Sequence, residues 1–180
     1  MLFRSLTPMC EPLGHTAGNA LEVWESVETL QGRGPDDLVM LTLDLAERVA
    51  NVPRAQLAKW LGDGTAWKKW TQLVEAQGAR AADTERILEI HAAPIRHAVC
   101  ATRDGTLTRM DAGLIGRACI ALGGGRSKAS DAIDFAVGMS GIAKTGTTVT
   151  SGQPLLTIHA RDDAALAQAR AFAEQAIAIA

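Results

Sequence analysis

The strongest constraint on the fold of this chain is a change of pattern near Pro94. Before it, apolar residues recur every three or four positions between glycines and prolines, the spacing of amphipathic helices. After it, short runs of alternating apolar and polar residues, typical of half-buried strands, are mixed with helical segments. A length of 180 residues suits one well-buried domain or two small ones. The sequence therefore predicts an α+β protein, with a helical segment over residues 1–86 and a mixed unit over residues 87–180.

Four helices are expected in the first half. The first has an apolar stripe at helical spacing, formed by Ala20, Trp24, Val27 and Leu30. The second starts near Pro35, with two carboxylates in a first turn where the helix dipole favours them. Its expected buried face consists of Leu38, Leu41, Leu45 and Val49. Pro53 begins a third helix, and a fourth ends at Gly78.

Two features of this half have alternative interpretations. Trp67 and Trp70 share one face of the fourth helix beside two lysines, where they could stack on nucleobases, but core packing is the favoured use. The polar stretch 79–86 is expected to be either a loose connection or the domain boundary.

The second half is predicted to mix strands and helices. Two alternating runs, 95–102 and 106–110, flank an Asp-Gly pair typical of tight turns and are expected to form a β-hairpin. Asp111 is expected to cap a helix that ends at the glycines 123–125. The remaining expected elements are strands over 133–139, 147–150 and 154–160, and a terminal helix over 162–180.

Charge and hydropathy argue against two classes of partner. The net charge is −2 and the 18 basic residues are scattered, so the sequence lacks the basic patch typical of nucleic-acid or anionic-membrane binding. No apolar run reaches the roughly 18 to 20 residues of a membrane span. The first ten residues also lack the apolar core of a signal peptide. We therefore expect a cytoplasmic protein with no nucleic-acid partner and no membrane partner.

The usual nucleophiles and metal ligands are dispersed. Three cysteines lie far apart and are interpreted as buried free thiols; they are Cys10, Cys100 and Cys119. Four histidines lack metal-ligand spacing and are interpreted as structural; they are His15, His91, His97 and His159. Three serines lack a G-x-S-x-G context; they are Ser127, Ser130 and Ser140. The residues alone therefore assign no catalytic group.

Two glycine-bearing stretches could hold ions. Residues 123–128 combine three glycines with Arg126 and Lys128, as an anion cradle would, but the glycines follow a helix, so a helix C-terminus is favoured. Residues 14–25 begin with a bent, glycine-bearing entry whose carbonyl oxygens could hold a cation near Glu25. The alternative for that stretch is an ordinary capped helix start.

Several segments follow one another in the order and spacing of a known family. Residues 9–23 read MCEPLGHTAGNALEV, and residues 28–38 read ETLQGRGPDDL. GTLTRMD, LGGGR and PLLTIHA follow, at 105–111, 122–126 and 154–160. These segments resemble the motifs of the pyrimidine-nucleoside and thymidine phosphorylases, beginning with M-x-x-P-L-G-x-x-x-G-N-A-L-E-V. The resemblance covers nearly the whole chain from Met9, whereas residues 1–6 match nothing in the family.

The resemblance implies an activity and a domain plan. Family members carry out reversible phosphorolysis, in which phosphate attacks the anomeric carbon of a pyrimidine nucleoside and releases the base and a pentose 1-phosphate. Their phosphate loop, K-H-S-x-G-G-x-G-D, and their base-gripping R…S…K set do not occur in this sequence. We therefore expect the C-terminal portion of such an enzyme, truncated or separately encoded and inactive alone. It would contain the rear of the large α/β domain and an α/β-hammerhead-like C-terminal module.

The resemblance also implies part of a cation site. Bacterial members hold a monovalent cation, usually K⁺, through backbone and side-chain oxygens at positions that match Leu13, Thr16 and Glu25. Thr16 stands where the family usually has a small apolar residue, which leaves a backbone carbonyl ligand unchanged. The remaining ligands belong to the phosphate loop, so half of the site is expected here.

Three hypotheses on function stay open. The first is an inactive portion of a phosphorylase whose substrates, by resemblance, are phosphate and a pyrimidine nucleoside. The second is an accessory binding or oligomerisation module for a full-length homologue or an N-terminal half, which would cover otherwise exposed apolar helix faces. The third is a fragment of a nucleotide (AMP-type) phosphorylase, which GNALEV at 18–23 disfavours.

Overall fold

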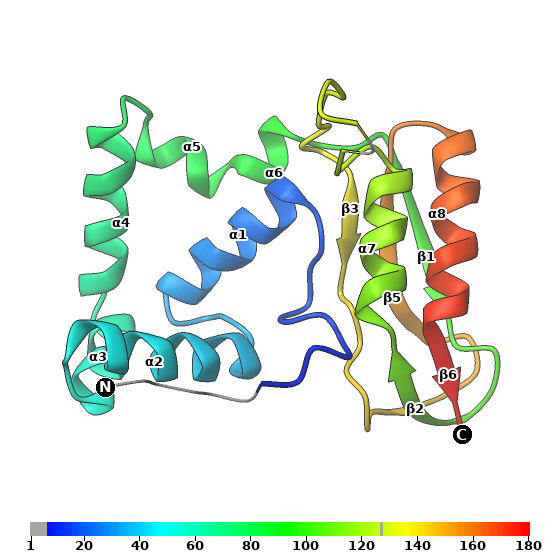
Figure 1. Ribbon diagram of the computed structural model, residues 1–180, viewed down its shortest axis with the longest axis horizontal. Coiled ribbons are helices and arrows are strands. Elements are labelled where there is room, and N and C mark those ends of the chain that lie inside the picture. The colour runs from blue at the N-terminus through cyan, green and yellow to red at the C-terminus, as the bar shows by residue number, and fades with distance from the viewer. Residues whose placement is uncertain (1–6, 127) are drawn as a thin grey trace.

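The computed structural model describes residues 7–126 and 128–180, so the expectations for residues 1–6 and for Ser127 lie outside the described residues. Within these residues, a group of helices forms one part of the molecule, and two antiparallel sheets with two helices form the other (Figure 1). The predicted α+β class is confirmed. The division at residue 86 stays a prediction.

The helical part confirms the four expected helices and adds two short ones. The elements are α1 (Asn19–Leu30), α2 (Asp36–Ala50), α3 (Arg54–Gly62), α4 (Thr65–Ala76), α5 (Ala81–Glu85) and α6 (Ile87–Ile90). The stretch 79–86 is therefore not a loose connection, because most of it forms α5. An ion pair between Arg80 and Asp83 spans the first turn of α5, with a distance of 2.9 Å between Nε and Oδ2.

The second part contains two three-stranded sheets. Its elements are β1 (Ile95–Cys100), β2 (Gly105–Met110), α7 (Ala112–Ala121), β3 (Gly138–Ser140), β4 (Thr148–Val149), β5 (Pro154–Ala160), α8 (Asp163–Ala176) and β6 (Ile177–Ile179). The strand orders are β1-β5-β3 and β4-β2-β6, and all pairings are antiparallel. Helices α7 and α8 lie side by side next to the sheets (Figure 1).

Side-chain caps start both of these helices. The Asp111 carboxylate accepts a 2.9 Å hydrogen bond from the amide of Leu114, as predicted. Asp162 accepts one of 2.8 Å from the amide of Ala165. Three fully buried alanines form a smooth stripe on α8 against the core, and they are Ala169, Ala173 and Ala176. The small side chains let α8 pack closely, which explains why this helix is rich in alanine.

The predicted β-hairpin is wrong. β1 pairs with β5, whereas β2 pairs with β4 and β6, so the chain passes from one sheet to the other between Cys100 and Gly105. The Asp-Gly signal is local and marks a bend, but it does not choose the partner strand. Here the Asp104 carboxylate accepts a 2.7 Å hydrogen bond from the backbone amide of Ser151. This bond holds the bend against the loop between β4 and β5.

Two further boundaries differ from expectation. Most of the predicted strand over 133–139 is irregular, because its backbone bonds elsewhere: Asp134 donates to Gly123 and Phe135 accepts from Ala20, at 2.9 and 3.2 Å. The terminal helix ends at Ala176, and the β-branched residues that follow pair with β2 as β6.

The expected buried face of α2 is also wrong. Leu43 is the buried residue of this helix, whereas Leu45 is 47% exposed and Val49 is 88% exposed. Leu38 and Leu41 are half-buried. The periodicity identified an apolar face correctly, but no described element covers the far end of that face.

Candidate functional site

Residues 10–18, called the strap from here on, connect the two parts of the molecule. Ala17 and Met139 exchange two backbone hydrogen bonds of 2.9 and 2.7 Å, so the strap pairs with β3. The carbonyl of His15 accepts a third, 2.9 Å bond from the amide of Ile142. The strap then leads directly into α1, which fixes the start of the helical part beside β3.

The ion pair between Lys144 and Asp37 also holds the strap in place. Lys144 Nζ lies 2.6 Å from Asp37 Oδ2 and 2.5 Å from the carbonyl oxygen of Pro12. The same carboxylate oxygen accepts a 3.1 Å bond from the amide of Gly14. Burial alone would raise the pKa of Asp37, but hydrogen bonds from Lys144 and Gly14 outweigh it and hold the pKa below its usual value.

The Glu25 carboxylate organises the inner face of the strap. Glu25 is 6% exposed, and its Oε1 accepts a 2.8 Å bond from the amide of His15. Its Oε2 accepts a 3.0 Å bond from Oγ1 of Thr16, which is 4% exposed. Gly14 has a φ of +67°, and a Cβ there would stand 2.2 Å from Glu25 Oε2. The glycine is therefore needed for both the bend and the close approach of the carboxylate.

The three predicted cation-site residues lie around one cavity. Leu13, Thr16 and Glu25 all line a cavity of about 520 Å³ between the strap, α1 and α7, called the strap cavity from here on. Leu13 is 46% exposed, so it stands at the mouth. Glu22 and Cys119 line other walls. The structure thus brings the predicted ligands together, and their identity as ligands stays a prediction.

The donor set fits a hard monovalent cation. The Glu25 carboxylate and the Thr16 hydroxyl line the cavity, and oxygen ligands of these types suit hard cations. Each oxygen of the Glu25 carboxylate accepts one hydrogen bond and keeps a second lone pair. The described residues contain no cluster of three or more His, Cys, Asp or Glu side chains, so a transition-metal site has no support in them.

The remaining sequence candidates divide into confirmed and corrected ones. The glycines 123–125 end α7, where Gly123 and Gly124 donate to carbonyls of that helix at 2.9 Å. The expectation of buried thiols is wrong for Cys10 and Cys100, which are exposed at the strap and on β1. Burial, with a smaller contribution from Glu22, raises the pKa of the Cys119 thiol to about 12.

Sequence reasoning missed two of the polar groups that hold this site. Asp37 was interpreted only as a charge at a helix N-terminus, and Lys144 was not singled out. They are 107 residues apart, and no local pattern links them. Ser140 and His159 are also paired, with 2.8 Å between Oγ and Nε2 on neighbouring strands, and neither residue lines the strap cavity.

Comparison with known proteins matches part of this chain to a family. Residues 106–180 match the family described as the pyrimidine nucleoside phosphorylase C-terminal domain. The resemblance to these phosphorylases is confirmed. A thymidine phosphorylase of Burkholderia lata is 37% identical over 183 residues, covering 91% of this chain and 40% of the relative. A pyrimidine-nucleoside phosphorylase of Bacillus subtilis is 34% identical over 164 residues, covering 86% of this chain and 38% of the relative.

The chain thus spans about two fifths of the length of these curated relatives, and it is similar to their C-terminal part. None of the helices within residues 7–126 and 128–180 has the length and apolar character that crossing a membrane requires.

Proposed function

We propose that this chain supplies the C-terminal part of a pyrimidine-nucleoside phosphorylase and serves the reversible phosphorolysis of a pyrimidine nucleoside. The observation that carries the proposal is the buried Glu25 carboxylate in the strap cavity, with Leu13 and Thr16 around it. The relatives support the substrate class, because they are thymidine and pyrimidine-nucleoside phosphorylases. The cytoplasm is the proposed compartment, since the three cysteines are free thiols, which suit a reducing environment.

We further propose that the 180 residues do not catalyse the reaction by themselves. Phosphorolysis needs positive charge and hydrogen-bond donors around the phosphate and the departing base. Glu22 and Glu25 line the strap cavity, and none of the described residues that line it is basic. The role proposed for this chain is to hold the cavity and the C-terminal domain in place for groups supplied from elsewhere.

A complementation assay tests both statements. The purified protein is incubated with thymidine or uridine and phosphate, and free base is measured by chromatography. The assay is repeated with the part of the Burkholderia lata thymidine phosphorylase that precedes the matched region, produced as a separate chain. We expect base release only from the mixture. Enzyme-like release by this chain alone would refute its inactivity, and no release from a mixture that forms a complex would refute its role in the reaction.

The cation is a separate part of the proposal. We propose that K⁺ binds in the strap cavity through the Glu25 carboxylate and through oxygens of Leu13 and Thr16. When bound, the ion supplies a positive charge beside a carboxylate that has no basic partner among the described residues. The protein itself orients that carboxylate through the His15 amide and the Thr16 hydroxyl.

Thermal unfolding measures this binding without reference to activity. Replacing tetramethylammonium chloride by KCl at equal ionic strength should raise Tm, because an ion that binds only the folded state stabilises that state. Glu25→Gln should remove the increase, whereas Glu22→Gln, which changes another carboxylate of the same cavity, should keep it. Equal responses of the two variants would place the ion elsewhere.

An accessory module is the second candidate function. Its support is the apolar surface of α2, where Leu45 is 47% exposed one turn before Val49, which is 88% exposed. Leu13, on the strap, adds to the exposed apolar area. Contiguous apolar patches on soluble proteins mark association sites. Complex formation without base release in the mixture would favour this candidate over the catalytic one.

A further inference from the structure

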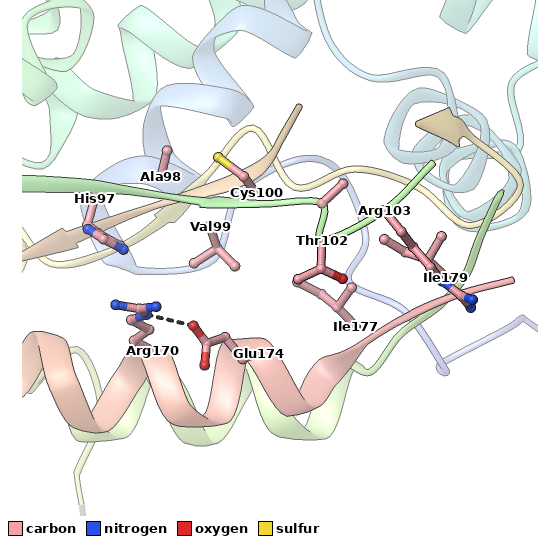
Figure 2. Close-up of a pocket in the computed structure, with 11 residues that line it drawn as sticks. His97, Ala98, Val99, Cys100, Thr102, Arg103, Arg170, Glu174, Ile177 and Ile179 are labelled. Atoms are coloured by element: carbon pink, nitrogen blue, oxygen red, sulfur yellow. Dashed lines mark hydrogen bonds and ion pairs between the residues drawn. The ribbon is translucent and has the colours of Figure 1, made fainter. Parts of the chain in front are cut away.

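A second cavity, larger than the strap cavity, lies in the C-terminal part. It is a groove of about 740 Å³ between β1 and α8, closed at one end by β6. Figure 2 shows His97 and Val99 directed from β1 toward α8, and Arg170 and Glu174 directed from α8 toward β1. We call it the β1–α8 groove. None of the residues assigned to the phosphorylase function lines it.

One wall of this groove is a free strand edge. β1 is the outer strand of the β1-β5-β3 sheet, and β5 is its only hydrogen-bonded neighbour among the described strands. β6 is likewise the outer strand of its sheet. An outer strand presents unpaired N–H and C=O groups that can pair with another extended segment. A free strand edge beside a groove whose other wall is a helix allows a peptide to bind by strand addition.

The groove lining selects the kind of peptide. Ile177 and Ile179 are half-buried and supply apolar surface, which suits alternate side chains of an extended segment. Arg103 has no carboxylate partner among the described residues. Arg170 forms an ion pair with Glu174, with 2.6 Å between Nε and Oε1. The lining therefore carries two guanidinium groups against one carboxylate, an excess of positive charge that a carboxylate on the ligand would neutralise.

We propose that the β1–α8 groove binds an extended acidic peptide that adds as a strand to β1 and places a carboxylate at Arg103. A second copy of this chain fits less well, because β1-to-β1 pairing would bring together segments 95–103 that carry two arginines and no acid each. A small free anion would use Arg103 but leave the strand edge and the apolar wall unfilled.

The experiment uses the whole chain and a defined probe. The probe is a fluorescein-labelled nine-residue peptide that alternates valine or threonine with glutamate, followed by fluorescence anisotropy. Arg103→Glu should weaken binding about tenfold or more, because it replaces attraction by repulsion. Glu174→Gln should strengthen binding, because it releases Arg170. Arg117→Glu makes the same charge change on α7, outside the groove, and should leave binding unchanged.

Three further measurements separate strand addition from its alternatives. N-methylation of alternate peptide amides should abolish binding, and amides of residues 95–103 should gain protection from hydrogen exchange when the unmodified peptide is added. Equal binding of a glutamine-substituted peptide, or full competition by free glutamate, would overturn the proposal. If sedimentation showed that Arg103→Glu dissociates a dimer, the free edge of β1 would instead be assigned to a second copy of the chain. None of these outcomes depends on phosphorolysis.

Discussion

Single glycines decide where the strap can lie. Gly138 in β3 has a φ of +150°, and a Cβ there would stand 2.2 Å from the carbonyl oxygen of Ala17. That contact is with backbone in the pairing between strap and β3, which cannot move aside cheaply. Gly116, by contrast, lies inside α7 with nothing within 4 Å of its virtual Cβ.

We expect Gly138→Ala and Gly116→Ala to change stability in opposite directions. Gly138→Ala should lower the free energy of unfolding by about 2 kcal/mol or more, from backbone strain and steric overlap. Gly116→Ala should raise it by roughly 0.5–1 kcal/mol, because alanine is the better helix former. Urea unfolding measures both. A neutral Gly138→Ala variant would show that the strap does not pair with β3 in solution.

The three thiols should differ in reactivity. Cys10 and Cys100 are exposed, whereas burial raises the pKa of Cys119 to about 12. Only the thiolate reacts with iodoacetamide, so at pH 8 we expect two alkylated cysteines in the native protein and three after denaturation. Peptide mass spectrometry locates them. Rapid native labelling of Cys119 would contradict its burial against the core of the C-terminal part.

The position of the strap relative to α2 depends on the ion pair between Asp37 and Lys144, which we call the clamp. The pKa of Asp37 is lower in the folded protein than its ordinary value, so the folded state binds protons less readily at this group than the unfolded state does. The stability that it contributes is present above the unfolded pKa of about 3.9 and is lost as pH falls through the lowered folded pKa.

Asp37→Asn should therefore lower Tm at pH 7 more than at pH 3. Asp36→Asn, one residue earlier and outside the clamp, controls for the loss of a charge at the start of α2. Differential scanning calorimetry at the two pH values measures both variants. A difference between wild type and Asp37→Asn that grows on acidification would contradict the clamp.

At the scale of the whole molecule, one apolar face is left uncovered. Leu45 and Val49 lie one turn apart on α2 and are both exposed, whereas Leu43 on the same helix is 7% exposed. Replacing Leu45→Glu and Val49→Lys together should leave the free energy of unfolding within about 0.5 kcal/mol and reduce self-association. Leu43→Ala should cost about 2 kcal/mol or more.

Chemical denaturation and sedimentation velocity make this comparison. A loss of stability in the double variant as large as that of Leu43→Ala would mean that the α2 face is buried in solution, as its periodicity had predicted. Unchanged stability with reduced self-association would identify the face as one that another chain covers.

Local signals were enough to predict many elements. The stripe of α1, the Asp111 cap of α7 and the glycines that end α7 act within a few residues of one another, so the sequence contains the whole interaction. The motif resemblance likewise placed Leu13, Thr16 and Glu25 together, and they line one cavity. Their role as ligands remains a prediction.

Short-range patterns in the sequence were enough to predict the α+β class, most helix starts and ends, and the resemblance to the phosphorylases. The pairing of the strands, the covered face of α2 and the groups that hold the strap depend on long-range contacts in the folded chain. The reason is separation along the chain. The pairing between β1 and β5 and the ion pair between Asp37 and Lys144 both join residues that are far apart in the sequence. An Asp-Gly turn or an apolar stripe predicts a bend or a face, and the rest of the fold supplies the partner.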